Sequence, residues 1–116
     1  MAKGPLKEPP LSVTISALIS GPDQYDGQRV IVSGHVRSIE LQEGRRGGSY
    51  VRIVLEEVGK ESDGPVPWVT VIILSIPPVR EGHDVLVQGV YHREGRQAGR
   101  IFEHFIDAEV ILKEKL

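Results

Sequence analysis

Two segments of the chain are almost alike, and each places a glycine inside an alternating apolar run. The first reads Arg29-Val-Ile-Val-Ser-Gly34-His-Val36 and the second reads Asp84-Val-Leu-Val-Gln-Gly89-Val-Tyr91. Alternation with a period of two is typical of β-strands, whereas a glycine within a strand marks a bend, a bulge or a close backbone approach. Two bent strands in a small all-β chain therefore predict a sheet that curls into a closed or nearly closed barrel.

Alternation and turn residues predict five strands along the 116 residues, a length that suits one domain. The predicted strands are Gln28 to Leu41, Tyr50 to Val58, Trp68 to Leu74, Asp84 to Arg93 and Arg100 to Lys113. The third is apolar on both faces, so we expect it to be the most buried.

The N-terminal part of the chain is expected to be a tether followed by a short element. Residues 1–12 are rich in proline and predict a flexible tether, which leaves 13–116 as the folded domain. Residues Val13 to Ser20 suit a short helix, with Ile15, Leu18 and Ile19 on one side, although their first residues also suit a strand.

Composition removes several classes of function. The chain has no cysteine, which excludes disulfides, a thiolate nucleophile, a zinc–cysteine site and an iron–sulfur cluster. The net charge of −2 means that affinity for nucleic acid has to come from local clusters of charge. No apolar run approaches transmembrane length, so we expect a cytoplasmic protein, or an extracytoplasmic one if a signal or anchor has been cut away.

A hairpin, a third strand, a connection and a final hairpin give the strand order of an OB-fold barrel. Over roughly residues 13–113 the chain resembles OB-fold (oligonucleotide- and oligosaccharide-binding) domains of the small bacterial single-domain type. The resemblance rests on the strand count, on the segment Gly27-Gln-Arg-Val-Ile-Val-Ser-Gly34-His-Val36 and on the similar segment Val85-Leu-Val-Gln-Gly89-Val. Adjacent prolines at 77 and 78 exclude the helix that is common between strands three and four of this fold. The segment before the first strand is expected to close the barrel's end instead, and an SH3-like barrel is the alternative.

Parity assigns the strand residues to two faces, because successive side chains point to opposite sides. The more uniformly apolar set is expected inside: Val30, Val32, Gly34, Val36, Val51, Ile53, Leu55, Val85, Val87, Gly89 and Tyr91. The outer set is Ile31, Ser33, His35, Arg37, Tyr50, Arg52, Val54, Glu56, Gln88, Val90 and His92.

The resemblance to the OB-fold implies a ligand site on strands two and three and on the loops that join strands one to two and four to five. Arginines concentrate at those loops, and an arginine fork suits a phosphate. We therefore expect a binding module for single-stranded DNA or RNA with low sequence specificity, in which Tyr50 stacks on a base. The predicted site residues are Arg37, Arg45, Arg46, Tyr50, Arg52, Arg93, Arg96 and Arg100. Trp68 would give the stacking platform if it faces outward, although a lone tryptophan of this kind is more often a core residue or a barrel plug.

Two other functions fit the same residues. Arginines at strand ends commonly keep an edge soluble, and Glu40, Glu43, Glu94 and Glu103 lie close enough in sequence to pair with them. A protein-interaction or assembly module, including a homodimer, would use the apolar outer positions Ile31, Val54, Val90 and Phe105. A barrel for an oligosaccharide or small ligand also fits the fold, without residues that favour it.

Metal binding and catalysis have little support in the sequence. His35, His92 and His104 would suit a divalent cation if the strands brought them together, but their spacing matches no known ligand pattern and ordinary surface histidines are expected. The segment Gly44-Arg-Arg-Gly-Gly-Ser49 lacks the lysine and the helix of a phosphate loop. We expect neither a cofactor nor a metal, and a protein that is not an enzyme.

Overall fold

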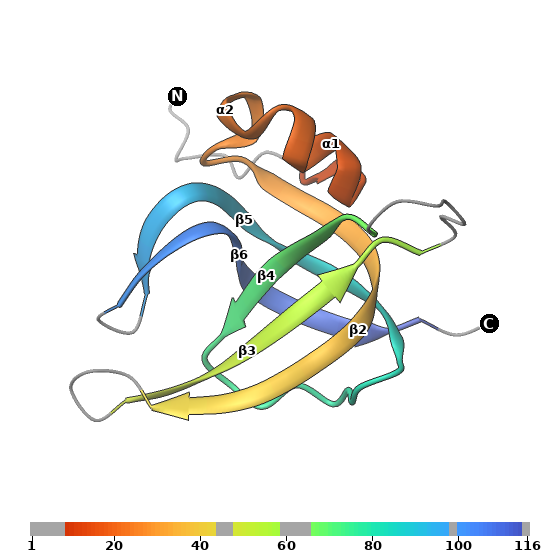
Figure 1. Cartoon of the computed structure of the whole chain (residues 1–116), viewed down its shortest axis with the longest axis vertical. Coiled ribbons are helices and arrows are strands. Elements are labelled where there is room, and N and C mark those ends of the chain that lie inside the picture. The colour runs from red at the N-terminus through yellow and green to blue at the C-terminus, as the bar shows by residue number, and fades with distance from the viewer. Residues whose placement is uncertain (1–8, 44–47, 59–65, 98–99, 115–116) are drawn as a thin grey trace, which may run out of the picture.

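The computed structural model describes residues 9–43, 48–58, 66–97 and 100–114 (Figure 1). Its elements are β1 (Leu11–Ser12), α1 (Ile15–Ser20), α2 (Pro22–Tyr25), β2 (Arg29–Glu43), β3 (Ser49–Glu56), β4 (Trp68–Ile73), β5 (Asp84–Gln97) and β6 (Arg100–Lys113). All five predicted strands are confirmed, and the segment before the first of them is helical. The last two residues of the expected tether form β1, which pairs in parallel with β2.

The strands form one sheet that closes on itself. Its order is β1-β2-β3-β4-β6-β5, and β5 pairs back onto β2, so that five strands make a ring (Figure 1). The neighbours in the ring are antiparallel except β4 and β6, which run parallel. The predicted five-stranded OB-like barrel is confirmed by this ring, in which the 15-residue β2 bends from one side to the other.

The two mid-strand glycines, Gly34 and Gly89, both lie at close approaches. A Cβ on Gly34 would overlap the side chain of Leu55, and a Cβ on Gly89 would overlap the backbone of Asp107 and Ala108. At Gly89 the register also shifts, because Gln88 pairs with Val110 while Gly89 pairs with Ala108. A bulge of this kind increases the local bend of a strand, which a closed ring needs.

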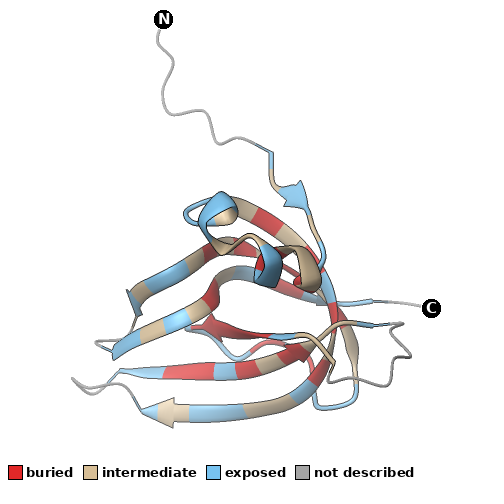
Figure 2. Ribbon diagram, turned by 45° about the horizontal axis from the view of Figure 1, so that its top comes forward, coloured by how far each residue is buried: buried red, intermediate tan, exposed pale blue. Residues whose placement is uncertain are grey.

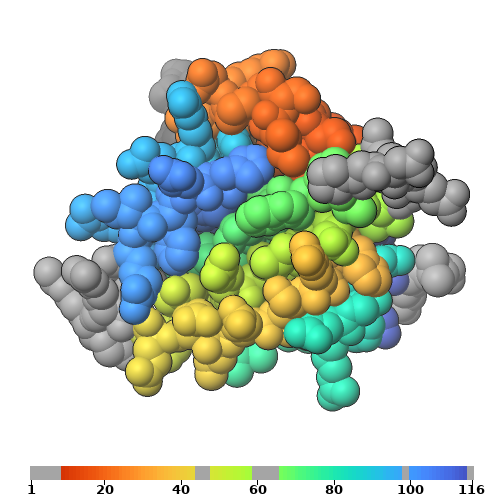
Figure 3. All heavy atoms as spheres, in the orientation of Figure 1, coloured from red at the N-terminus to blue at the C-terminus, as the bar shows by residue number. Residues whose placement is uncertain are grey.

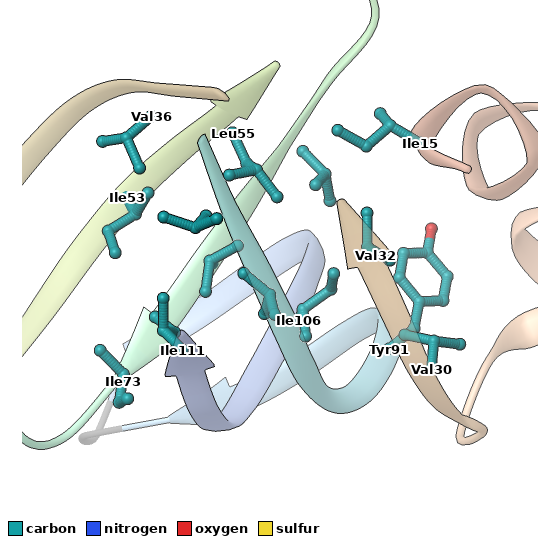
Figure 4. Close-up of a cluster of buried hydrophobic side chains, with 14 of the residues drawn as sticks. Ile15, Val30, Val32, Val36, Ile53, Leu55, Ile73, Tyr91, Ile106 and Ile111 are labelled. Atoms are coloured by element: carbon teal, nitrogen blue, oxygen red, sulfur yellow. The ribbon is translucent and has the colours of Figure 1, made fainter. Parts of the chain in front are cut away.

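The interior of the ring is filled with aliphatic side chains and one tyrosine (Figure 4), and each strand of the ring carries buried residues (Figure 2). Val30 and Val32 from β2, Ile53 from β3 and Ile106 from β6 have no exposed surface. Tyr91 is also fully buried, as parity predicted. Burial of such side chains away from water stabilises the fold by about 1.5–3 kcal/mol each.

Helix α1 closes one end of the ring, where Ile15 and Leu18 join the same core. The helix begins after Thr14, whose hydroxyl accepts a hydrogen bond from the Ala17 N–H at 3.0 Å. The carboxylate of Glu57 accepts further hydrogen bonds from the backbone and the hydroxyl of Ser16, at 2.8 and 2.9 Å. These contacts satisfy N–H groups that a helix leaves open at its first turn. The connection 74–83 contains no helix, as the prolines predicted.

Candidate nucleic-acid interface

The outer face of β3 and β4 carries a second apolar cluster, separate from the interior of the ring. Tyr50, Ile72 and Phe105 are buried there, and the partly exposed Phe102 packs against them. The Tyr50 and Phe102 ring centroids are 5.6 Å apart in an edge-to-face arrangement, and those of Phe102 and Phe105 are 5.7 Å apart. These are favourable separations for aromatic pairs.

This cluster corrects two expectations. Tyr50 lies on the predicted outer side of its strand, but it is only 4% exposed and cannot offer a ring face to a base. Phe105, expected on an outer apolar surface, is 1% exposed. Both pack against rings of the β5–β6 hairpin: Tyr50 contacts Phe102, and Phe105 contacts Phe102 and His92. Gly95 of that hairpin lies so close to the Phe105 ring that a Cβ there would be 3.3 Å from it.

A hollow of about 550 Å³ lies beside this cluster, between the two arginine-bearing hairpins. Its lining residues are Gln42, Tyr50, Arg52, Arg96, Arg100, Ile101 and Phe102. Four of the eight predicted site residues therefore meet in one place. The Arg100 guanidinium also donates a hydrogen bond to the Glu43 carbonyl at 3.3 Å, which ties the two hairpins together across the hollow.

A second hollow, of about 290 Å³, continues from the first. It is lined by Arg37, Ser38, Arg52, Val54 and Trp68, so Arg52 belongs to both. We call the two together the basic groove. It crosses the outer surface of β3 and β4, which Figure 3 shows between the β5–β6 hairpin and the end of β2. Arg37 is the additional residue at a register shift of β2, and its guanidinium lies 3.7 Å from the Glu56 carboxylate.

Trp68 is the exposed aromatic residue of this surface. It is 44% exposed, so the expectation of a core residue or a plug is wrong. The reason is register: Trp68 pairs with Glu56, an outward residue, and Val69 takes the inward position beside Leu55. Because successive side chains of a strand alternate, the residue before the inward-facing Val69 is expected on the outer face, where Trp68 lies.

Beyond Trp68 the surface opens into a larger hollow of about 670 Å³, under α2 and beside the β5–β6 hairpin. We call it the acidic cleft, and its lining is Ile19, Pro22, Asp26, Trp68, Tyr91, Arg93, Glu94, Glu103 and His104. The Arg93 guanidinium forms an ion pair with Asp23, and its backbone N–H donates to the Asp26 carboxylate at 2.9 Å. Arg93 thus fastens α2 to β5 and is not brought together with the arginines of the groove, contrary to the expected site.

Tyr91, which is buried, and His104, which is half-buried, form the floor of the acidic cleft. The Tyr91 hydroxyl lies 2.6 Å from Nδ1 of His104, and His104 has a left-handed backbone with φ of 53°. Nε2 of His104 is buried without a hydrogen-bond partner among the described residues. Burial lowers the pKa of His104, partly opposed by the Trp68 backbone, and burial raises the pKa of Tyr91.

The three histidines considered for a metal site, His35, His92 and His104, contact different neighbours. His35 lies 2.9 Å from the Asp84 carboxylate, and the His92 ring packs on Phe105 with centroids 5.2 Å apart. In the part of the chain that the structure describes, no three histidine, aspartate or glutamate side chains gather closely enough to hold an ion. Arg45 and Arg46 lie outside the described residues, so their role stays a prediction.

Comparison with known proteins identifies the fold. No family model and no curated protein sequence matches the chain. Among solved structures, a small single-stranded DNA-binding protein from Streptomyces coelicolor matches with a TM-score of 0.55 and 20% identity, over 76% of this chain and 93% of that one. A protein described as an aspartyl-tRNA synthetase from Leishmania major matches with a TM-score of 0.57 and 14% identity.

The synthetase match covers 100% of this chain but only 23% of the synthetase, so the chain corresponds to about a quarter of that protein. Together with the ring of strands, these matches show that the chain has an OB-fold. None of the helices within the described ranges has the length and apolar character needed to cross a bilayer.

Proposed function

We propose that this OB-fold domain binds single-stranded DNA or RNA along the basic groove, with little sequence preference, and that it acts by binding rather than by catalysis. The observation that carries the proposal is the continuity of the groove: two hollows share Arg52, with Arg96 and Arg100 at one end and Trp68 at the other. A strand needs such a track, because its phosphates and bases recur along a line.

The arginines of the groove are available for phosphate. Arg52, Arg96 and Arg100 are exposed, and none of them forms an ion pair with another residue that the structure describes. A guanidinium donates two parallel hydrogen bonds to a phosphate, and this geometry favours arginine at such sites. Arg37 lies farther along, beside Glu56, and would extend the same track.

Two aromatic residues replace Tyr50 as stacking platforms. Phe102 lines the first hollow and is partly exposed, while Trp68 is exposed at the far end of the second. Stacking on an aromatic ring tolerates any base, which is consistent with low sequence specificity. The rival assembly surface loses one of its four residues, since Phe105 is buried.

The structural neighbours are consistent with a nucleic-acid ligand. One is named as a single-stranded DNA-binding protein and the other as a tRNA synthetase. The fold by itself does not determine the ligand, so the weight of the proposal rests on the groove.

The test is fluorescence anisotropy of labelled oligo-dT and oligo-rU, titrated with the protein over a range of salt concentrations. The double variant Arg52→Ala/Arg96→Ala is expected to weaken binding and to reduce the salt slope by about 1.4, which corresponds to two lost phosphate contacts at roughly 0.7 each. The matched control is Arg80→Ala, an exposed arginine outside the groove, which should leave both quantities unchanged. Absence of binding at low salt, or an equal effect of Arg80→Ala, would contradict the proposal.

A further inference from the structure

We propose that the acidic cleft is a base-recognition subsite, which holds a single nucleobase carrying an exocyclic amino group, with guanine preferred, against Trp68. This inference rests on the proposed function, in which the strand lies in the adjoining basic groove. It adds a specific position to a surface that otherwise binds any sequence.

The cleft has the size and the position for one base. Its volume of about 670 Å³ falls within the range of roughly 300–1,000 Å³ that is usual for small-molecule sites. Trp68 lines both the cleft and the basic groove. A strand that follows the groove therefore reaches the cleft at an aromatic ring that is already 44% exposed.

The charges of the cleft disfavour a phosphate and favour a hydrogen-bond donor. Three carboxylates line it, those of Asp26, Glu94 and Glu103. Its one arginine, Arg93, forms an ion pair with Asp23. Ionised carboxylates only accept hydrogen bonds, so a ligand here has to donate them. The phosphates of a strand would remain in the groove while a base turns into the cleft.

A direct pairing of two glutamates supports a ligand at this place. Glu94 and Glu103 are cross-strand partners on β5 and β6. Like charges directly opposite each other destabilise an antiparallel pair. Within the described ranges neither forms an ion pair that would relieve the repulsion, and no metal-binding group includes them. A ligand that donates hydrogen bonds to this glutamate pair would remove the cost.

The chemistry of the bases then sets an order of preference. Guanine presents N1–H and the N2 amino group side by side, so one carboxylate can accept both hydrogen bonds. Cytosine and adenine offer only an amino group, and a carboxylate accepts from the amino group of cytosine in known complexes. Uracil and thymine have no amino group and are expected to bind most weakly.

The chain's single tryptophan gives a direct measurement, because Trp68 contributes the one indole N–H signal of a ¹⁵N–¹H spectrum. We expect guanosine 5′-monophosphate to shift this signal saturably, with a Kd about tenfold lower than that of uridine 5′-monophosphate. Glu103→Gln and Glu94→Gln should each reduce this preference, whereas Glu81→Gln, an exposed glutamate outside the cleft, should not. No shift, equal affinity for the two nucleotides, or the same loss in Glu81→Gln would overturn the inference.

A second measurement separates this inference from the proposed function. Anisotropy compares oligo-dT with the same oligomer carrying one dG, and tighter binding of the latter supports the subsite. If both oligomers bind with strong salt dependence but equally, and the mononucleotides do not differ, the base subsite is wrong and the groove stands. If the mononucleotides differ but neither oligomer binds at low salt, the groove is wrong while the cleft still selects its base.

Discussion

The basic groove and the acidic cleft lie on one continuous surface, and Trp68 is their common boundary. In the groove, Arg52 and Arg96 project without ion-pair partners among the described residues. In the cleft the one arginine is held by an aspartate, and carboxylates dominate the lining. The two regions therefore suit opposite parts of a nucleotide, the phosphate and the base.

The comparison shows why counting arginines near a loop is a weak guide to a binding site. Arg93 and Arg96 are three residues apart on one strand, yet they lie in different hollows. Arg93 stabilises the position of α2, whereas Arg96 belongs to the open surface of the groove. Residues three apart on a strand point to opposite faces, so parity already separates the two, and the ion pair with Asp23 then gives Arg93 its different role.

The largest effect on stability is expected for Phe105, because its ring packs next to residues of both the groove and the cleft. Phe105 packs on Phe102, which lines the groove, and on His92, next to the cleft residue Arg93. Phe105→Ala should lower the free energy of unfolding by about 3–5 kcal/mol, because it leaves a cavity under the hairpin. Urea denaturation measures this, with the partly exposed Phe102→Ala as the milder control. A loss below about 1 kcal/mol would show that the hairpin does not depend on this ring.

A smaller effect is expected at the boundary itself. Trp68→Leu should weaken the binding of oligo-dT by about 1–3 kcal/mol, the usual contribution of one stacked base. The salt slope should stay the same, because no phosphate contact is lost. Anisotropy at several salt concentrations separates the two quantities, and a changed slope would mean that Trp68 also positions the arginines.

The floor of the cleft predicts that the stability of the protein depends on pH. Burial lowers the pKa of His104 below the ordinary value of 6.5, so the folded state favours the neutral ring. Stability from this residue is complete above the unfolded pKa and decreases as the pH falls below it, because the unfolded chain takes up the proton first. Melting temperatures at pH 7.5 and 5.5 should therefore differ more in the natural chain than in His104→Gln. If the two proteins showed the same change in melting temperature between these pH values, the effect could not be assigned to His104.

The smallest effect concerns the glutamate pair of the cleft. Glu103→Gln removes one of two opposed charges and should raise the free energy of unfolding by roughly 0.2–1 kcal/mol. Glu40→Gln, on the far side of the groove and opposite Arg52, should not stabilise the protein. Denaturation of both variants in parallel measures the difference, and a destabilised Glu103→Gln would show that this carboxylate has a structural partner.

Local patterns predicted the strands and their faces well. The alternation in β2, β3 and β5 placed Val30, Ile53 and Tyr91 in the interior, where they are buried. The mid-strand glycines were also informative, since Gly34 and Gly89 lie at the predicted close approaches. These features depend on a few consecutive residues, and sequence carries such information directly.

The candidate site depended on contacts between distant segments, and there the prediction was incomplete. Tyr50 and Phe105 have outward parity, but they are buried because they pack in a second apolar cluster with Ile72 and Phe102, whose members come from β3, β4 and β6. The partner of Arg93 lies 70 residues away in α2. Neither the covering of an outer face nor an ion pair of this range follows from periodicity.

The position of β6 in the ring has a consequence for how the chain acquires its structure. The last strand lies between β4 and β5, and the first long strand pairs with β5, so Arg29 meets Val90. The two junctions that β6 makes, with β4 and with β5, therefore stay open until the final strand is in place. Loop closure over such separations is slow, so we expect folding in milliseconds to seconds and as a single cooperative step. An emerging chain would hold exposed strand edges until β6 has been synthesised.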